Sequence, residues 1–273
     1  MPRSAHAKHL IAVCGLALML AACSSTKEPE YVERPVAELY NTAQDLLDQK
    51  EYQKAAKAFD EVERQHPYSL WATKATLMSA YAYYQDNKYD DAISALDRFI
   101  SLHPANADVA YAYYLKALSY YEQISDVRRD QQMTEKAMQS LDDVIRRFPD
   151  SKYARDAKLK KDLTVDHMAG KEMSVGRYYQ DRGDYLAAIN RFQKVVTTYQ
   201  TTTHVPEALS RLTECYLALG LTGEAKKTAS VLGYNFPGSE WYKDSYDLLL
   251  NKKQDSDDES WWDSTTTAIS DLF

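Results

Sequence analysis

Histidine and cysteine are the residues in this chain that most readily act as nucleophiles, proton carriers or metal ligands, but their spacing favours none of these uses. His66 and His103 each precede a proline that recurs at the same place in a repeated pattern, which indicates a structural position. His167 and His204 stand alone, and Cys215 lies in a predicted helix as a small packing residue. The sequence has no glycine-rich phosphate loop, nucleophile elbow or His-Glu-x-x-His motif. We therefore expect no catalytic residue, no metal site and no cofactor, and hence a protein that is not an enzyme.

One other cysteine does predict chemistry, although of a processing kind. Arg3 and Lys8 precede an apolar run that ends at Ala22 and is shorter than the about 20 residues that span a bilayer. The run closes in Leu20-Ala21-Ala22-Cys23, which resembles the bacterial lipobox. The resemblance implies that residues 1–22 are a lipoprotein signal peptide and that Cys23 is lipidated, with a diacylglycerol on its sulfur and a fatty acid such as palmitate on its amine. A plain secretory signal with an incidental cysteine is the alternative.

The segment after Cys23 is expected to be a tether. Residues 23–36 contain Lys, Glu and Pro with little apolar mass, as in a linker from a lipid anchor. Ser24, rather than Asp, follows the cysteine, which in lipoproteins suits passage to the outer membrane. We therefore expect a protein that is lipid-anchored in the outer membrane and faces the periplasm. After removal of the signal and acylation of Cys23, Cys215 is left without a partner for an intramolecular disulfide.

The charge of the chain argues against nucleic acid as a partner. The formal net charge is -7, whereas nucleic-acid binding requires a basic face. Six of the 40 acidic residues lie in residues 255–273, which have no Lys or Arg but contain Trp261-Trp262. This segment reads as an acidic, disordered tail.

The body of the chain repeats a pattern five times. A small residue in a first helix is followed by an aromatic residue, then by Ala-x-x-x-Phe or Ala-x-x-x-Leu in a second helix, and then by proline. The matching positions are Ala43, Leu46, Tyr52, Ala55, Phe59 and Pro67; Ala80, Tyr83, Tyr89, Ala92, Leu96 and Pro104; Ala117, Tyr120, Ala137, Leu141 and Pro149; Gly176, Tyr179, Gly183, Tyr185, Ala188 and Phe192, with Gln200 in place of proline; and Tyr216, Gly220, Ala225 and Pro237. Two residues after each proline stands a helix-capping residue: Ser69, Asn106, Ser151 or Ser239. This pattern resembles the tetratricopeptide repeat, a helix–turn–helix unit.

The spacing between repeats is irregular at two places. Eight extra residues fall in Ser125–Gln132, where we expect an elongated turn. Fourteen extra residues between Pro149 and Gly176 amount to about four helical turns and predict a long helix from about Lys152 to Gln180. Ser239–Lys252 is expected to be a capping helix.

We therefore predict an all-α protein: a tetratricopeptide-repeat superhelix of five helix-turn-helix repeats, with a long helix opening the fourth and a C-terminal capping helix. Residues 37–151 hold N-terminal repeats 1–3, and residues 152–254 hold C-terminal repeats 4–5 with the capping helix.

The first helices of such repeats line a groove, and this chain places aromatic residues there at i, i+4, i+7 spacing. Tyrosine combines apolar area with a hydroxyl that tolerates water, as a peptide-binding surface requires. The predicted substrate-peptide groove lies in the N-terminal half and consists of Tyr40, Leu77, Tyr81, Tyr84, Tyr111, Tyr114, Leu118 and Tyr121. Burial of these residues within the superhelix is the alternative. The corresponding C-terminal positions are mostly polar, for example Arg177, Gln180 and Glu214.

Roughly residues 20 to 240 resemble the BamD family, the lipoproteins of the outer-membrane β-barrel assembly machine. The most specific stretches are Tyr81-Ala82-Tyr83-Tyr84 leading to Asp97-Arg98-Phe99-Ile100, and Ser174-Val175-x-x-Tyr178-Tyr179-x-x-Arg182-Gly183 leading to Asn190-Arg191. Generic repeats do not dictate Asp97-Arg98 or Asn190-Arg191. The short third-repeat insertion and the acidic tail depart from the family pattern.

The resemblance implies a subunit of the Bam complex that acts in protein insertion into the membrane. Its N-terminal half would bind unfolded outer-membrane proteins, and its C-terminal half would dock on the periplasmic domain of a BamA-like β-barrel insertase, beside other assembly-machine lipoproteins. Arg191 falls on the family position for insertase docking, and Arg182 is either its companion there or the cap of a turn. The alternative is a repeat lipoprotein scaffold for peptidoglycan synthesis or cell-division proteins; an envelope hydrolase has no supporting motif.

Overall fold

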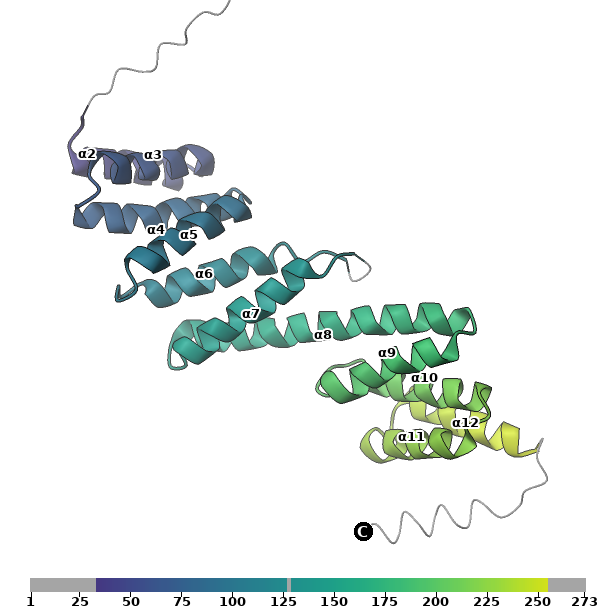
Figure 1. The fold of residues 1–273 in the computed structure, drawn as a ribbon. Helices are drawn as coiled ribbons and strands as arrows, with labels where there is room; N and C mark the ends of the chain where they lie inside the picture. The colour runs from purple at the N-terminus through teal and green to yellow at the C-terminus, as the bar shows by residue number, and fades with distance from the viewer. Residues whose placement is uncertain (1–32, 127–128, 255–273) are drawn as a thin grey trace, which may run out of the picture.

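The chain folds into a stack of helix pairs. The computed structural model describes residues 33–126 and 129–254, and within these ranges it contains eleven helices and no strand. Each of the first ten helices packs against the next, so the stack grows in one direction from α2 to α11 (Figure 1). The prediction of an all-α superhelix is confirmed.

Five antiparallel pairs and a final helix make up the stack. The pairs are α2 (Val36–Asp48) with α3 (Tyr52–Gln65), α4 (Leu70–Gln85) with α5 (Tyr89–Leu102), α6 (Val109–Tyr121) with α7 (Gln132–Arg147), α8 (Lys152–Asp181) with α9 (Tyr185–Thr198), and α10 (Val205–Ala218) with α11 (Thr222–Asn235); the last helix is α12 (Glu240–Gln254). The predicted elongated turn falls between the end of α6 at Tyr121 and the start of α7, although Gln132, the last of the extra residues, already belongs to α7.

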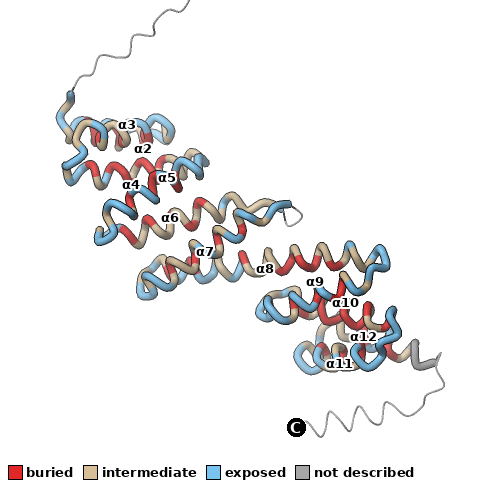
Figure 2. The backbone as a smooth tube through the Cα atoms, viewed as in Figure 1, coloured by how far each residue is buried: buried red, intermediate tan, exposed pale blue. Residues whose placement is uncertain are grey.

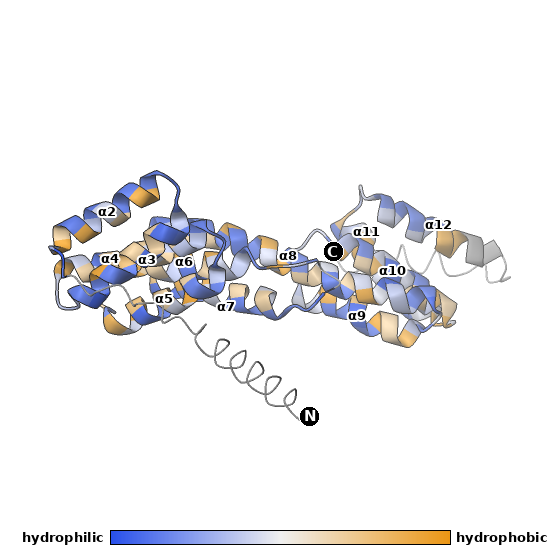
Figure 3. Ribbon diagram, turned by 90° about the horizontal axis from the view of Figure 1, so that it is seen from above, coloured by the Kyte–Doolittle hydropathy of each residue, from blue (hydrophilic) through white to orange (hydrophobic). Residues whose placement is uncertain are grey.

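The core follows the repeated sequence pattern. The small residues of the first helices, such as Ala43 and Ala117, are fully buried, and so are the large second-helix residues Phe59, Leu141 and Phe192. Figure 2 shows buried residues along the faces where the helices meet. Helices such as α3 and α7 stabilise the stack through one apolar stripe, whereas α4 and α6 bury residues against neighbours on both sides. Hydrophilic and hydrophobic residues alternate along most helices in Figure 3.

The predicted caps form in three of four repeats. The hydroxyls of Ser69, Ser151 and Ser239 accept hydrogen bonds from the backbone N–H three residues later, at 3.0, 3.2 and 3.2 Å. Asn106 differs, and its prediction as a helix cap is wrong. Its Oδ1 accepts from the N–H of Asp108 at 2.8 Å, because this turn is longer and α6 begins only at Val109.

The turn inside four of the five pairs uses one residue with positive φ. This residue is Lys50 (φ 62°), Asn87 (φ 58°), Gly183 (φ 79°) or Gly220 (φ 75°). The N–H groups of this residue and the next bond back to carbonyls of the last turn of the first helix. A left-handed residue at this place lets the chain reverse within a few residues, at a steric cost that only glycine escapes.

Helix α8 joins the two halves of the stack. It runs from Lys152 to Asp181, so the predicted long helix is confirmed. Its first half buries Ala157 in the core formed with α6 and α7, and its second half buries Met173 in the core formed with α9 and α10. One continuous helix thus belongs to both cores and connects the N-terminal repeats to the C-terminal repeats (Figure 1).

The C-terminal end of the stack is closed by α12. This helix packs on α10 and α11, and its Ser245 hydroxyl donates to Ser210 Oγ at 3.0 Å. No helix within residues 33–126 and 129–254 has the length and apolarity to cross a membrane. The signal peptide, Cys23, most of the linker and the acidic tail lie outside the described residues.

Candidate functional site

Half-buried tyrosines gather on the first helices of the second and third repeats. Five of them were predicted for the groove, and the structure adds a sixth from the start of α8. The tyrosine cluster consists of Tyr81, Tyr84, Tyr111, Tyr114, Tyr121 and Tyr153. It extends over α4, α6 and α8, and α6 contacts both of the other helices.

Ring contacts within the tyrosine cluster, and hydrogen bonds from its hydroxyls to neighbouring carboxylates, hold these side chains in place. The Tyr153 ring lies 5.1 Å from the Tyr114 ring and 5.5 Å from the Tyr111 ring, measured between centroids. The Tyr114 hydroxyl donates to the carboxylate of Asp156, and the Tyr84 hydroxyl donates to Glu122 Oε1 at 3.4 Å. The rings are thus held in fixed positions while part of each remains accessible, as a preformed binding surface requires.

The hydroxyls of Tyr84, Tyr111 and Tyr114 stay neutral. Burial raises the pKa of Tyr84 to about 12, with a further contribution from the charge of Glu122. Burial also raises the pKa of Tyr111 and that of Tyr114, the latter with help from the hydrogen bond to Asp156. These groups therefore act as hydrogen-bond donors and apolar surface and do not exchange protons near neutral pH.

Two predicted groove residues belong to the core instead. Tyr40 is 5% exposed, because the side chains of Phe59 and Trp71 cover its ring at centroid distances of 5.3 and 4.8 Å. Leu77 is 6% exposed and packs in the core between α4, α5 and α6. The placement of these two residues on an accessible surface is therefore corrected. Leu118 is half-buried against the same core as Leu77.

A hollow of about 320 Å³ lies at the end of the tyrosine cluster. Its lining includes Tyr121, Ile124, Leu163 and His167 from α6, α8 and the turn after α6. The Nε2 atom of His167 is buried there and has no hydrogen-bond partner in the structure. The Lys160 ammonium lies 5.2 Å from the centre of the Tyr121 ring. Glu122 and Thr164 complete the lining, so the hollow combines apolar and polar walls, with the positive charge of Lys160 nearby.

The predicted docking residue Arg191 forms part of a charged cluster between α8 and α9. Glu172 of α8 is 8% exposed and accepts hydrogen bonds from Arg191 at 3.1 Å and from Lys194 at 2.6 Å. Burial opposes ionisation, but the hydrogen bonds and charges of Lys194 and Arg191 outweigh it and hold the pKa of Glu172 below its usual range. The side chain of Arg191 is still 42% exposed, so it can also meet a partner.

Sequence reasoning missed Glu172 and Lys194. A detectable signal was present: Glu172 stands three residues after Ala169 and four before Gly176, on the buried stripe of α8. A carboxylate at such a position requires a cationic partner from the neighbouring helix.

The other predicted docking residue, Arg182, is engaged locally. It follows α8, and its guanidinium lies 5.5 Å from the centre of the Tyr178 ring and donates to the Tyr178 hydroxyl at 2.9 Å. It also pairs with Asp184 at 3.5 Å. The hollow beside Arg191 is lined by Tyr179, Ala187, Asn190, Arg191 and Lys194, so Arg182 lies outside that surface.

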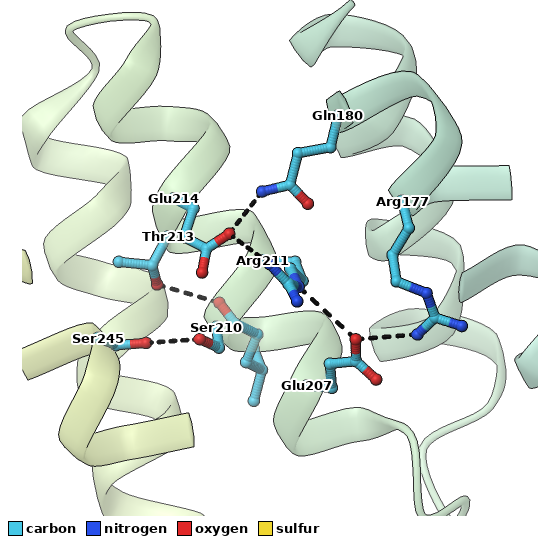
Figure 4. Close-up of polar contacts among 9 residues, drawn as sticks. Arg177, Gln180, Glu207, Ser210, Arg211, Thr213, Glu214 and Ser245 are labelled. Atoms are coloured by element: carbon cyan, nitrogen blue, oxygen red, sulfur yellow. Dashed lines mark hydrogen bonds and ion pairs between the residues drawn. The ribbon is translucent and has the colours of Figure 1, made fainter. Parts of the chain in front are cut away.

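Charged residues replace tyrosines on the first helices of the fourth and fifth repeats. Glu207 of α10 accepts from Arg177 at 2.9 Å and lies 3.6 Å from Arg211 Nε (Figure 4). Glu214 accepts from Arg211 at 3.0 Å and from Gln180 (Figure 4). The two halves of the stack therefore present different chemistry, aromatic in the N-terminal half and ionic in the C-terminal half.

The described residues give no support for catalysis by Cys215. This thiol is fully buried, and burial raises its pKa to about 12, so it stays protonated and unreactive. No group of three or more His, Cys, Asp and Glu side chains in residues 33–126 and 129–254 is arranged to hold a metal ion.

Stacked helix pairs with distinct surfaces and buried fingerprint residues define a scaffold protein of the tetratricopeptide-repeat class. Residues 32–232 match the sequence profile of the family YfiO, described as outer membrane lipoprotein, and the chain belongs to this family. Two relatives are named outer membrane protein assembly factor BamD. That of Caulobacter vibrioides is 52% identical over 88% of this chain and 79% of its own, and that of Rickettsia prowazekii is 50% identical over 89% and 97%.

A more distant relative with the same name, from Neisseria meningitidis serogroup B, is 36% identical over 93% of this chain and 98% of its own. Among solved structures, the tetratricopeptide-repeat protein TTC0263 of Thermus thermophilus has a TM-score of 0.37 at 18% identity, covering 79% of this chain and 99% of its own.

Proposed function

We propose that this chain is a lipoprotein subunit of the outer-membrane β-barrel assembly machine. In this proposal it binds unfolded barrel proteins and docks on the insertase, which assembles and inserts them. The family and the printed names of the relatives support a role in outer-membrane protein assembly. They favour this role over a scaffold for peptidoglycan synthesis or cell-division proteins.

The observation that carries the proposal is the tyrosine cluster. Unfolded barrel proteins offer extended segments in which apolar and polar side chains alternate, and such segments need apolar surface beside hydrogen-bonding groups. The tyrosine cluster supplies both, since its rings are half-buried and the hydroxyls of Tyr84, Tyr111 and Tyr114 remain neutral. The hollow beside Tyr121 is the proposed seat of a substrate's terminal aromatic side chain, with Lys160 available to a terminal carboxylate.

Docking on the insertase is assigned to the charged cluster of the C-terminal half. Arg191 and Lys194 share one carboxylate, that of Glu172, so the cluster keeps an excess positive charge at its surface. An acidic patch on a periplasmic domain would complement this charge. Arg182 is 61% exposed and could add a contact only at the rim of such an interface.

Attachment to the membrane is assigned to Cys23. Acyl chains on this residue would hold the chain at the outer membrane with its repeats in the periplasm, beside the insertase and other lipoproteins of the machine. The bilayer would thus be a permanent partner and the unfolded barrel protein a transient one.

Site-specific photocrosslinking tests the substrate surface. A photoreactive phenylalanine analogue in place of Tyr84 should crosslink to an unfolded barrel protein, because residue 84 lies in the tyrosine cluster. The same analogue in place of Tyr178, which is 56% exposed near the far end of α8, is the matched control and should not. Equal crosslinking from both positions would contradict the proposed surface.

A further inference from the structure

Large apolar side chains are exposed where the first and second repeats meet. Tyr68, in the turn between α3 and α4, is fully exposed, and Leu70, at the start of α4, is 92% exposed. Trp71 is 39% exposed, and Leu102, at the end of α5, is 61% exposed. We call these four residues the apolar edge. Leu, Tyr and Trp side chains that are exposed to water at neighbouring helix ends indicate a surface that a membrane or another protein covers.

The apolar edge is continuous across two repeats. Leu70 and Leu102 line one hollow of about 470 Å³, together with the buried side chains of Leu77 and Phe99. Lys74 and Asp108 also line this hollow, so its charged groups are balanced. The edge therefore offers an apolar contact surface. It carries no net charge that would favour a charged peptide as its partner.

Arg34, among the first residues that the structure describes, lies close to this edge. The backbone N–H of Arg34 donates to Gln65 Oε1 at 2.9 Å, and its carbonyl accepts from His66 Nε2 at 2.7 Å. These bonds fix Arg34 to the end of α3, immediately before the turn that carries Tyr68. In Figure 1 the chain enters α2 beside the connection from α3 to α4. Ten residues of sequence separate Arg34 from Cys23, and the eleven chain steps between them reach at most roughly 40 Å.

We infer that the apolar edge rests in the interfacial layer of the same phospholipid leaflet that holds the acyl chains of Cys23. Trp and Tyr favour the membrane–water interface, and Leu70 and Leu102 gain by leaving water. A short tether keeps the local lipid concentration high, so a small apolar contact suffices as a second membrane signal. The contact would also fix the orientation of the stack, and hence the height of the tyrosine cluster above the lipid.

This inference rests on the proposed acylation of Cys23, but it can be tested without it. The chain from residue 24 onward, carrying an N-terminal hexahistidine tag, is tethered to phosphatidylcholine vesicles that contain a nickel-chelating lipid. Leu70→Cys carries a nitroxide spin label, and Leu186→Cys is the control, because Leu186 is 69% exposed on α9 in the other half of the stack. Cys215 is fully buried and does not compete for the label.

Collision rates of the label with oxygen, which concentrates in lipid, and with chromium oxalate, which stays in water, report its depth. The label at residue 70 should favour oxygen on the vesicles and should lose this preference when imidazole releases the tether, while the label at residue 186 stays water-like throughout. A water-like label at residue 70 on the vesicles overturns the inference. So does a label at residue 70 that becomes immobile only when an insertase is added, since a protein would then cover the edge.

Failure of the anchoring proposal gives a different result. Mass spectrometry of the protein from its native membrane would find no acyl groups on Cys23, whatever the spin label reports on chemically tethered vesicles. No unfolded peptide takes part in the depth measurement, so it is also independent of the proposed substrate binding.

Discussion

The ring of Phe192 in α9 lies so close to Gly176 in α8 that a methyl group at residue 176 would overlap it. Phe192 is fully buried, and it also packs in the core shared by α8, α9 and α10. In the fourth repeat, which has glycine where repeats one to three have alanine, the Phe192 ring occupies the space that a methyl group at residue 176 would fill. The packing of α8 against α9 therefore requires a residue without a side chain at position 176.

Gly176→Ala is therefore expected to destabilise the protein by about 1–3 kcal/mol, because the core must shift to admit the methyl group. Urea unfolding followed by circular dichroism measures the change. Gly223→Ala in α11 is the control, since nothing lies within 4 Å of the added carbon, and it should be neutral or stabilising. Combining Gly176→Ala with Phe192→Leu should cost less than the sum of the two single changes; simple additivity would contradict the contact.

Glu172→Gln should destabilise the protein by about 1–3 kcal/mol at neutral pH, because Arg191 and Lys194 lose a charged acceptor. The pKa of Glu172 is lowered in the folded protein, so its stabilisation is present above the unfolded pKa of about 4.3 and is lost as the pH falls through the folded pKa. Unfolding free energies measured from pH 7 downward should therefore converge for wild type and variant in acid. Glu224→Gln, which removes an exposed pair with Lys227, should change little at any pH. A constant difference across the pH range would argue against an ionised Glu172.

The positive-φ turns predict substitutions of opposite sign at equivalent positions. Lys50→Gly should stabilise the protein by up to about 1 kcal/mol, because it relieves a left-handed conformation. Gly220→Ala should destabilise it by about 1–2 kcal/mol, because it introduces that strain. Differential scanning calorimetry reports both as shifts of the melting temperature. Shifts of the same sign would mean that the two turns are not equivalent.

Arg191→Glu should reduce co-purification of the insertase by about tenfold or more, since a like charge would face an acidic partner. Quantitative pull-down from detergent-solubilised membranes gives the readout, and circular dichroism checks that the helices remain. Arg155→Glu, an exposed substitution in the first half of α8, is the charge-matched control. Glu172→Gln adds a second test: it disrupts the same ion pair but leaves Arg191 positive, so it should retain the insertase. If both variants lose it, the effect comes from stability and the docking assignment is wrong.

The sequence was sufficient to predict the helices because each repeat position is defined by near neighbours along the chain. Spacing between Pro149 and Gly176 predicted α8 within one residue of its observed end, since extra residues in a helix add length directly. Three of the four predicted caps are confirmed for the same reason. The prediction for Asn106 is wrong because the turn before α6 is longer.

Exposure was harder to predict, because it depends on packing between distant residues. Tyr40 and Tyr114 have the same position in their helices, but Trp71 covers Tyr40 whereas Tyr114 remains partly accessible beside Tyr153. Glu172 was missed because its two partners come from the next helix, at separations of 19 and 22 residues. The apolar edge was missed because helix spacing does not show which helix ends remain uncovered.

Binding of an aromatic-terminated barrel peptide tests the central claim most directly. Fluorescence anisotropy should show that Tyr81→Ala and Tyr114→Ala, each still folded at the assay temperature, weaken the affinity by about 5- to 150-fold, the equivalent of 1–3 kcal/mol. Tyr178→Ala, outside the tyrosine cluster, should bind as wild type. Wild-type affinity in both cluster variants, with only a lowered melting temperature, would show that these tyrosines serve the core and would contradict the proposed substrate surface.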